Sequence, residues 1–411
     1  MSEIISVTDA LRMIRSDFSS VETEWVSIEE SLDRVIADDI FASIASPPFD
    51  NSSMDGFAVV SEDLKDASSS NPFELEVIGD IPAGKIPLEV LRRGQTIRIS
   101  TGGVIPKGAD AVIPVEDTNL GIFQTGSSFP KTILANRSIK KGDYIREKGQ
   151  DIKHGELILG SNSKLRPQDI GALASQGNSR VLVYRKPKIG ILSTGDELVE
   201  IDQELQSGKI YNSNYFTLSN LLKKYGCLSV DLSTTKDNEN SITKKLNQAA
   251  DLNLDLIIST GGVSMGAFDY LKKIIEKNGT LKLWRVNIRP GKPLVFGRYR
   301  EVPYIGLPGN PVSSFIIFEV FVRPVIGKLS GLEKVDRISR NVFLKESITS
   351  DGRESYLRAI IKNENGNLVA ELAGHQGSGN IFSLVKANGI IIVPTGIKFL
   401  PPNSELQAWI F

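Results

Sequence analysis

Apolar runs alternate with amphipathic stretches between residues 181 and 330. KIGILST, LDLIIST and VPYIGLPG are continuous apolar runs, and each is followed by apolar residues at helical spacing. Buried strands that alternate with amphipathic helices are typical of a mostly parallel sheet covered on both faces. The pattern therefore predicts a three-layer α/β domain in this part of the chain.

Two other segments read as β-structure. Between residues 45 and 145 short apolar runs lie between Gly, Pro, Asn and Asp, which predicts a β-rich insertion. After Gly331 the β pattern returns, and Asn365-Gly366 predicts a tight hairpin turn between two strands. We expect a small β-barrel to close the chain.

Helices are predicted outside these segments. One begins near Thr8, and the spacing Ser27-x-x-Glu30 predicts a capping box ahead of SLDRVIADDI. A short helix is expected over residues 165–177, with Pro167 in its first turn and a glycine just past its end.

The predicted organisation has four domains. They are a connecting domain of residues 1–44 and 146–178, a β-rich insertion of residues 45–145, an α/β domain of residues 179–330, and a C-terminal barrel of residues 331–411.

Composition narrows the class of protein. A chain of 411 residues exceeds what one ordinary core accommodates, so several domains are expected. The net charge of −1 provides no global field that would recruit nucleic acid or anionic lipid. No uncharged stretch approaches the roughly 20 residues of a membrane span. Cys227 is the only cysteine, and the N-terminus carries charges where a signal peptide needs an apolar run, so we expect a cytoplasmic protein.

Histidine is scarce, which limits the metal chemistry. His154 and His375 are the only two, so zinc sites built on several His or Cys ligands are excluded, as is a cysteine cage for an iron–sulfur cluster. Any metal must be bound by oxygen ligands, which favours a hard cation such as Mg²⁺.

Three loops of the α/β segment follow predicted strands. GDEL contains Asp196 and Glu197, GGVSMGAFD ends on Asp269, and GNPVSS opens a helix. Ligands of open α/β sheets bind at the carboxyl ends of the strands, and glycines let backbone amides approach a phosphate. Each loop alone fits a tight turn equally well, but several in one domain favour a ligand site.

Each of the other polar segments has both a functional and a purely structural interpretation. Arg289 and Lys292, in RPGKP, suit an oxyanion or simple solvation at the surface. Asp237, in TTKDN, is typical of a helix cap or a turn. PPFDNSSMDGFAVV, with Asp55, and RISTGGVIPKGADAV, with Thr101, carry more polar detail than simple connectors need, although a structured turn and a hairpin bend would also explain them.

Taken together, these loops resemble the molybdopterin molybdenumtransferase family, which includes MoeA and the gephyrin E domain. The matching motifs occur in the family's order over nearly the whole chain: PPFDNSSMDGFAV, RISTGGVIPKGADAV, STGDEL, GKIYNSN, STGGVSMGAFDY, RPGKPLVFG, GLPGNPVSS and GHQGSG.

The resemblance implies that the α/β segment is a molybdopterin-binding domain of the MoaB/Mog type. It implies insertion of molybdenum from molybdate into the dithiolene of adenylylated molybdopterin, with AMP released and Mg²⁺ as the cofactor. Such a substrate would explain glycine loops beside carboxylates, because a pyrophosphate binds to amides and a divalent cation binds to acids.

The family's functional residues fall on specific positions here. The resemblance implies catalytic roles for Asp55, Thr101, Glu197, Asp237 and Asp269. It implies metal ligation by Asp237, Asp269 and Glu197, and molybdate binding by Lys292, Arg358 and Ser378. Substrate binding is expected at Gly261, Gly262, Ser264, Arg289, Lys292, Pro308, Gly309, Asn310 and Ser313. Asp151 matches a further acidic position, for which the sequence gives no role.

The family's assembly gives a further expectation. In relatives, the acid and threonine of the insertion meet the α/β acids across a dimer interface, so a homodimer with composite sites is expected. The resemblance also allows a transient contact with molybdopterin adenylyltransferase.

Three alternatives stay open from the sequence alone. The chain could be a molybdopterin adenylyltransferase-like enzyme, or a gephyrin-like binding scaffold. Tungstate could replace molybdate, because the two oxyanions have nearly the same size and charge.

Overall fold

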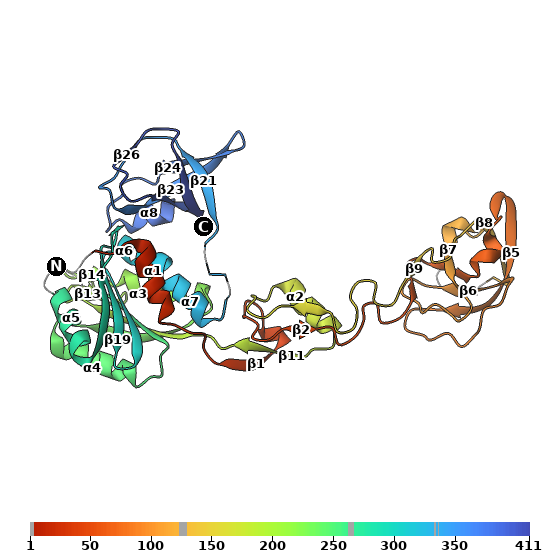
Figure 1. Ribbon diagram of the computed structural model, residues 1–411, viewed down its shortest axis with the longest axis horizontal. Coiled ribbons are helices and arrows are strands. Elements are labelled where there is room, and N and C mark those ends of the chain that lie inside the picture. Colours follow the sequence, from red (N-terminus) through yellow and green to blue (C-terminus); the bar gives the residue numbers. More distant parts are fainter. Residues whose placement is uncertain (1–3, 123–129, 262–266, 333, 336) are drawn as a thin grey trace. The chain divides into compact units, whose positions relative to one another are not determined.

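The computed structural model describes residues 4–122, 130–261, 267–332, 334–335 and 337–411, without the side chains of residues 267–269. Its chain forms two compact units (Figure 1). The first comprises Met1–Asp38, Ser161–Gly171 and Asn178–Phe411, and the second comprises Asp39–Gly160 and Ala172–Gly177. The predicted boundaries of the four domains stay predictions.

A six-stranded sheet is the centre of the first unit. Its strand order is β15-β12-β16-β20-β19-β17. Strands β15, β12, β16 and β20 are parallel neighbours, whereas β19 is antiparallel to β20 and to β17. The strands are β12 (Lys188–Thr194), β15 (Leu228–Thr235), β16 (Leu256–Thr260), β17 (Gly279–Arg285), β19 (Pro293–Tyr299) and β20 (Val302–Leu307).

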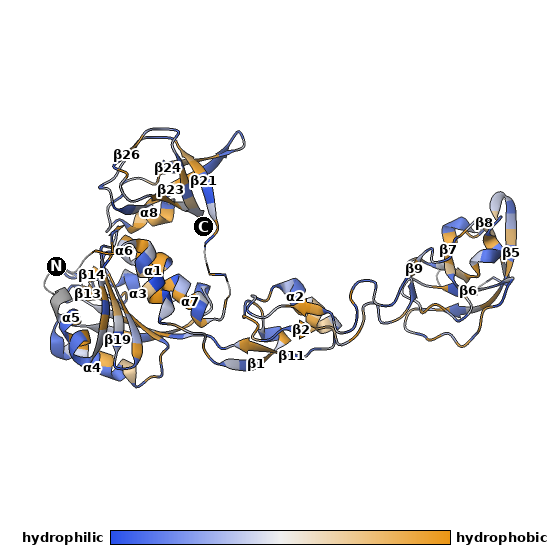
Figure 2. Ribbon diagram, in the orientation of Figure 1, coloured by the Kyte–Doolittle hydropathy of each residue, from blue (hydrophilic) through white to orange (hydrophobic). Residues whose placement is uncertain are grey.

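Helices cover both faces of this sheet. Along β16, Leu256 and Ile258 belong to one apolar cluster and Ile257 belongs to another, as expected when successive side chains point to opposite faces. Helices α1 (Val7–Ser16), α3 (Ser213–Lys224), α6 (Pro311–Ile317) and α7 (Arg323–Leu329) contribute to the first cluster. Helices α4 (Glu239–Ala250) and α5 (Ala267–Asn278) contribute to the second. Figure 2 shows the mixed polarity of α1, as expected for a helix with one buried side. The predicted three-layer α/β domain is confirmed.

The C-terminal region is a closed five-stranded β-barrel, as predicted. Its strands pair in the order β23-β24-β21-β27-β25, and β25 pairs with β23 to close the ring. Asn365 and Gly366 have φ values of 51° and 87° between β23 and β24, which is the left-handed conformation that a two-residue hairpin turn requires. The strands are β21 (Ser339–Leu344), β23 (Glu354–Glu364), β24 (Asn367–Leu372), β25 (Gly389–Val393) and β27 (Glu405–Ile410).

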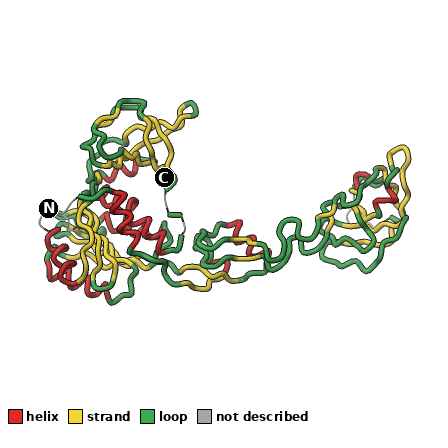
Figure 3. The backbone as a smooth tube through the Cα atoms, in the orientation of Figure 1, coloured by secondary structure: helices red, strands yellow, loops and turns green. Residues whose placement is uncertain are grey.

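The second unit is rich in β-structure, as the sequence predicted. A five-stranded sheet has the order β7-β4-β6-β5-β8, and Figure 3 shows the unit mostly as strands and loops. The strands are β4 (Gly56–Val59), β5 (Ser68–Ile81), β6 (Gln95–Ile99), β7 (Ala111–Pro114) and β8 (Thr132–Arg137).

The two predictions for short helices had different outcomes. The helix expected over residues 165–177 is α2 (Pro167–Ser175). The prediction of a helix after the capping box is wrong, because only a 3₁₀ turn, η1 (Ile28–Glu30), forms there. The Ser27 side chain makes no capping hydrogen bond. Strand β1 (Thr23–Ser27) pairs with β11 (Arg180–Tyr184), and Ile36 bridges to β11 as well, so sheet pairing overrides the local helix signal.

A buried carboxylate connects the helical layer to the barrel. Glu319 is 2% exposed and accepts hydrogen bonds from the Tyr225 hydroxyl at 3.0 Å and from Arg337 at 2.5 Å. The Arg337 guanidinium also lies 5.3 Å from the centre of the Trp409 ring, on strand β27. Burial, together with the charge of Glu319, raises the pKa of Tyr225 to about 12. This cluster helps to fix how the barrel meets the α/β domain.

We expect Glu319→Gln to lower the free energy of unfolding by about 3 kcal/mol, because it removes a buried carboxylate that balances the charges of Arg337 and Arg323. Urea unfolding would measure the change, with Glu204→Gln, at an exposed position, as the matched control. Equal stability of the two variants would contradict the structural role of this ion pair.

Candidate functional site

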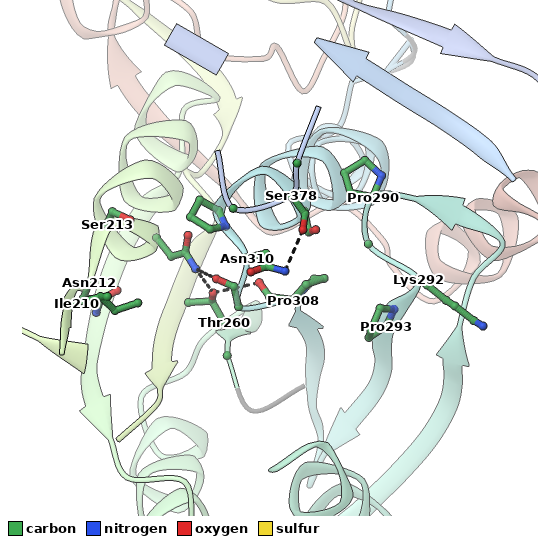
Figure 4. Close-up of a pocket in the computed structure, with 18 of the residues that line it drawn as sticks. Ile210, Asn212, Ser213, Thr260, Pro290, Lys292, Pro293, Pro308, Asn310 and Ser378 are labelled. Carbon is green, nitrogen blue, oxygen red and sulfur yellow. Dashed lines mark hydrogen bonds between the residues drawn. The ribbon is translucent and has the colours of Figure 1, made fainter. Parts of the chain in front are cut away.

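A pocket of about 800 Å³ opens in the first unit, where β12, β16 and β20 end (Figure 4). Residues just beyond the carboxyl ends of these strands line one part of it. The segment 289–293 and the barrel residues 376–379 line another part. The pocket therefore lies where open α/β sheets bind their ligands, and it has a second wall from the barrel.

Backbone packs against backbone on the pocket floor. Gly261 has a φ of 91°, and a Cβ atom there would lie 2.0 Å from the carbonyl oxygen of Thr194. A Cβ on Gly309 would lie 3.4 Å from the Cα atom of Gly261. Three strand ends thus approach one another without side chains between them, and a ligand can reach the main chain there.

Asn214, on α3, ties two of these strand ends together. Its Nδ2 donates to the Thr260 hydroxyl at 2.9 Å and to the Gly309 carbonyl at 2.7 Å. Asn214 lies in the GKIYNSN motif, but that motif by itself predicts no role for it. A polar side chain at the start of a helix beside two glycine loops would have been the reason to single it out.

Carboxylates gather at the end of β12. Glu197 lies against Gly195, since a Cβ there would be 2.8 Å from Glu197 Oε2. Asp237 Oδ1 is buried and has no hydrogen-bond partner among the described residues. Burial raises the pKa of Asp237, the charges of Glu197 and Asp196 raise it further, and the nearby Thr194 hydroxyl opposes them without forming a hydrogen bond of normal geometry. An unpartnered carboxylate oxygen beside a second acid is suited to bind a cation.

Arg358 is a buried cation on the barrel side. It is 0% exposed, and it donates from Nε to Ser383 Oγ at 3.0 Å and from Nη2 to the Gly377 carbonyl at 3.1 Å. No carboxylate pairs with it among the described residues. Burial, with a smaller effect from the charge of Arg289, lowers the pKa of Arg358 to about 10. A buried guanidinium without a counter-ion is suited to bind an oxyanion from the pocket.

Ser378 links the barrel wall to the α/β wall. Asn310 Nδ2 donates to Ser378 Oγ at 3.0 Å, and the Val312 amide donates to the Ser378 carbonyl at 3.0 Å (Figure 4). Two residues predicted for different ligands, Asn310 and Ser378, are therefore direct neighbours.

Arg289 and Lys292 also line the pocket. Arg289 Nη1 lies 3.9 Å from the Asp351 carboxylate, which Arg353 contacts more closely. In Figure 4 the Lys292 side chain extends away from Asn310 and Ser378. Contact between Lys292 and a ligand shared with Ser378 would therefore need another side-chain rotamer.

The pocket collects most of the predicted residues of the first unit. Those that line it are Glu197, Asp237, Gly261, Arg289, Lys292, Pro308, Gly309, Asn310, Ser313, Arg358 and Ser378. Gly262, Ser264 and the side chain of Asp269 lie outside the described part of the chain. No group of three or more His, Cys, Asp or Glu residues forms a metal site among the described residues, so the predicted three-acid metal set stays a prediction.

Asp55 and Thr101 belong to the second unit, where the structure brings them together. The Thr101 amide and hydroxyl both donate to Asp55 Oδ1, at 2.7 and 3.0 Å, and both residues are exposed. Asp151 is also in this unit and accepts a hydrogen bond from Arg146 at 2.8 Å. Asp55 and Thr101 are thus hydrogen-bonded to each other at the surface, and their catalytic role stays a prediction.

The raised pKa of Asp237 has a consequence for stability. A carboxyl with a higher pKa in the folded chain stabilises the fold below its unfolded pKa, and this contribution is lost as pH rises through the folded pKa. We therefore expect Asp237→Asn to increase the free energy of unfolding at about pH 7, and the gain to shrink toward about pH 4.

Urea unfolding at both pH values, with divalent cations removed, would measure this difference. Asp202→Asn, at an exposed position, is the control. A gain for Asp237→Asn that does not depend on pH would contradict the electrostatic explanation.

Family models match three successive parts of the chain. Residues 5–177 match the MoeA N-terminal region (domain I and II), residues 190–328 match a probable molybdopterin binding domain, and residues 341–411 match the MoeA C-terminal region (domain IV). No described helix is long and apolar enough to cross a membrane.

Full-length relatives agree with these matches. A molybdopterin molybdenumtransferase from Haemophilus influenzae is 38% identical over 90% of each chain, and one from Bacillus subtilis is 35% identical over 98% of this chain and 93% of its own. The crystal structure of a molybdopterin biosynthesis MoeA protein from Pyrococcus horikoshii OT3 is 30% identical and covers 100% of both chains, with a TM-score of 0.83. The chain therefore belongs to the molybdopterin molybdenumtransferase family.

Proposed function

We propose that this protein inserts molybdenum from molybdate into adenylylated molybdopterin and releases AMP, as a cytoplasmic enzyme of molybdenum cofactor biosynthesis. One observation carries the proposal. A single pocket combines a glycine floor at three strand ends, an unpartnered carboxylate, and a buried arginine without a counter-ion. Each of these features suits a different part of the reaction, and the names of the relatives support the same chemistry.

The glycine floor would hold the phosphates of the substrate. Gly261 and Gly309 leave the main chain open, and Asn310 precedes α6, whose N-terminal end carries partial positive charge. Ser313, in α6, also lines the pocket. These groups would orient the phosphates without a lysine of the P-loop type.

Molybdate would bind on the barrel wall. It is a tetrahedral dianion, and Arg358 with Ser378 offers it a guanidinium and a hydroxyl at one edge of the pocket. Burial strengthens the interaction, because few water molecules compete for the guanidinium. Lys292 would add a second positive charge after a change of rotamer. The same groups would accept tungstate.

The acidic side of the pocket fits Mg²⁺. The unpartnered Oδ1 of Asp237 and the carboxylate of Glu197 are oxygen donors of the kind that this cation prefers, and Asp269 is proposed as the third. When bound, the cation would offset negative charge on the phosphate oxygens. Asp237 and Glu197 would hold the cation on one side of the substrate, and Arg358 would hold the oxyanion on the other side.

We also propose that the active unit is a homodimer with composite sites. Asp55 Oδ1 accepts from both the amide and the hydroxyl of Thr101, which orients the carboxylate, and this pair is exposed. In this proposal the pair of one copy completes the pocket of a second copy. Transient contact with the adenylyltransferase would deliver the substrate.

The first test follows AMP release and sulfur-bound molybdenum together, with adenylylated molybdopterin, Mg²⁺ and molybdate. We expect Arg358→Gln to lower molybdate-dependent turnover by about a hundredfold or more. Its melting temperature should not fall, because the substitution removes an uncompensated buried charge.

Arg340→Gln, at an exposed barrel position, is the matched control and should keep full activity. AMP release that does not respond to molybdate would reduce the protein to a hydrolase. Transfer of AMP from ATP to molybdopterin would instead identify an adenylyltransferase.

The second test addresses the composite site. Asp55→Ala and Asp237→Ala chains should each be inactive, and mixing them after subunit exchange should restore up to about a quarter of the activity, because random pairing places both intact halves in one site of each mixed dimer. Activity that stays absent in verified mixed dimers would contradict the homodimer proposal.

A further inference from the structure

A second concave surface of the first unit is strongly basic. It is a groove of about 360 Å³ between the end of β11, the C-terminal ends of α3 and α7, and the segment 32–35. Eight Lys and Arg residues and one acid, Asp33, are among the described residues that line it. Such an imbalance is local, because the whole chain has a net charge of −1.

Four of these cations are paired within the protein. Lys164 pairs with Asp33 at 2.7 Å, and the arginines pair with nearby acids. The other four are exposed and have no ion-pair partner among the described residues: Lys186, Lys223, Lys224 and Lys334. The described acids near the groove therefore neutralise four of the eight cations, and the other four give its rim a positive charge.

The helix dipole explains the positions of only two of these four unpaired lysines. Lys223 and Lys224 lie in the last turn of α3, where cations interact favourably with the helix dipole. Lys186 follows strand β11 and Lys334 follows α7, so neither lies within a helix. The helix dipole therefore does not account for these two lysines.

Part of the groove is apolar. Leu32 is 48% exposed and Leu332 is partly exposed, whereas Ile326 and Val335 lie buried beneath the surface. Helices α3 and α7 end at the groove, and carbonyl groups of their last turns accept hydrogen bonds from the amides of Tyr225, Gly226 and Ser330. A small phosphate ligand prefers helix N-termini, whereas an extended acidic chain can bind the rim and place apolar side chains on the apolar part.

We propose that this groove is a docking site for an acidic segment of a partner protein, in which Asp or Glu residues alternate with large apolar residues. The acidic side chains contact Lys186, Lys223, Lys224 and Lys334, and the apolar side chains pack on Leu32 and Leu332. The site is separate from the pocket of the proposed reaction, because the two share no lining residue.

Fluorescence anisotropy with a labelled peptide of alternating Glu and Leu tests the proposal. The variant Lys186→Glu/Lys334→Glu changes only the two lysines that lie outside helices, and Lys244→Glu/Lys277→Glu makes the same change of charge on exposed positions of α4 and α5. We expect the peptide to bind wild type and the control equally, and the groove variant at least about tenfold more weakly. Affinity should fall as salt is added, and all three proteins should turn over adenylylated molybdopterin at the same rate.

Three results would overturn the proposal. One is no peptide binding at low salt, and another is equal binding by the groove variant. The third is tighter binding of a thymidine oligonucleotide or of inorganic pyrophosphate at the same lysines, which would assign the groove to nucleic acid or to a small anion.

Discussion

The pocket depends on the close approach of three strand ends. Gly261 packs against the Thr194 carbonyl so closely that no side chain fits between them, and Gly309 lies against Gly261 in turn. This packing makes the floor of the pocket out of main chain. It also brings the acids after β12 and the first turn of α6 to one edge of the sheet. Charges of opposite sign, on Asp237 and Arg358, then line the same cavity without neutralising each other.

The barrel is as important to the site as the sheet. Arg358 and Ser378 come from the barrel, and their distance from the glycine floor depends on how the two domains meet. Contacts that help to fix this geometry include the hydrogen bonds from Asn310 and from the Val312 amide to Ser378, and the ion pair between Glu319 and Arg337. A site assembled in this way can hold one ligand in contact with acids, backbone and cations together.

Periodicity alone predicted the α/β sheet and the closing barrel, because continuous apolar strands and the Asn365-Gly366 turn have local signatures. Local signals failed where pairing with a distant strand decided the structure, as at the capping box of Ser27. The candidate residues came from motifs. Motifs could not indicate that Asn214 links Thr260 to Gly309, or that Arg358 is buried without a counter-ion, because both facts depend on the tertiary fold.

A crystal structure with adenylylated molybdopterin and molybdate tests the central claim most directly. The account predicts phosphate oxygens on the main chain at Gly261 and Gly309, with the oxyanion within hydrogen-bonding distance of the Arg358 guanidinium. A ligand bound outside this pocket, with Arg358 still buried and without contact to any anion, would contradict it.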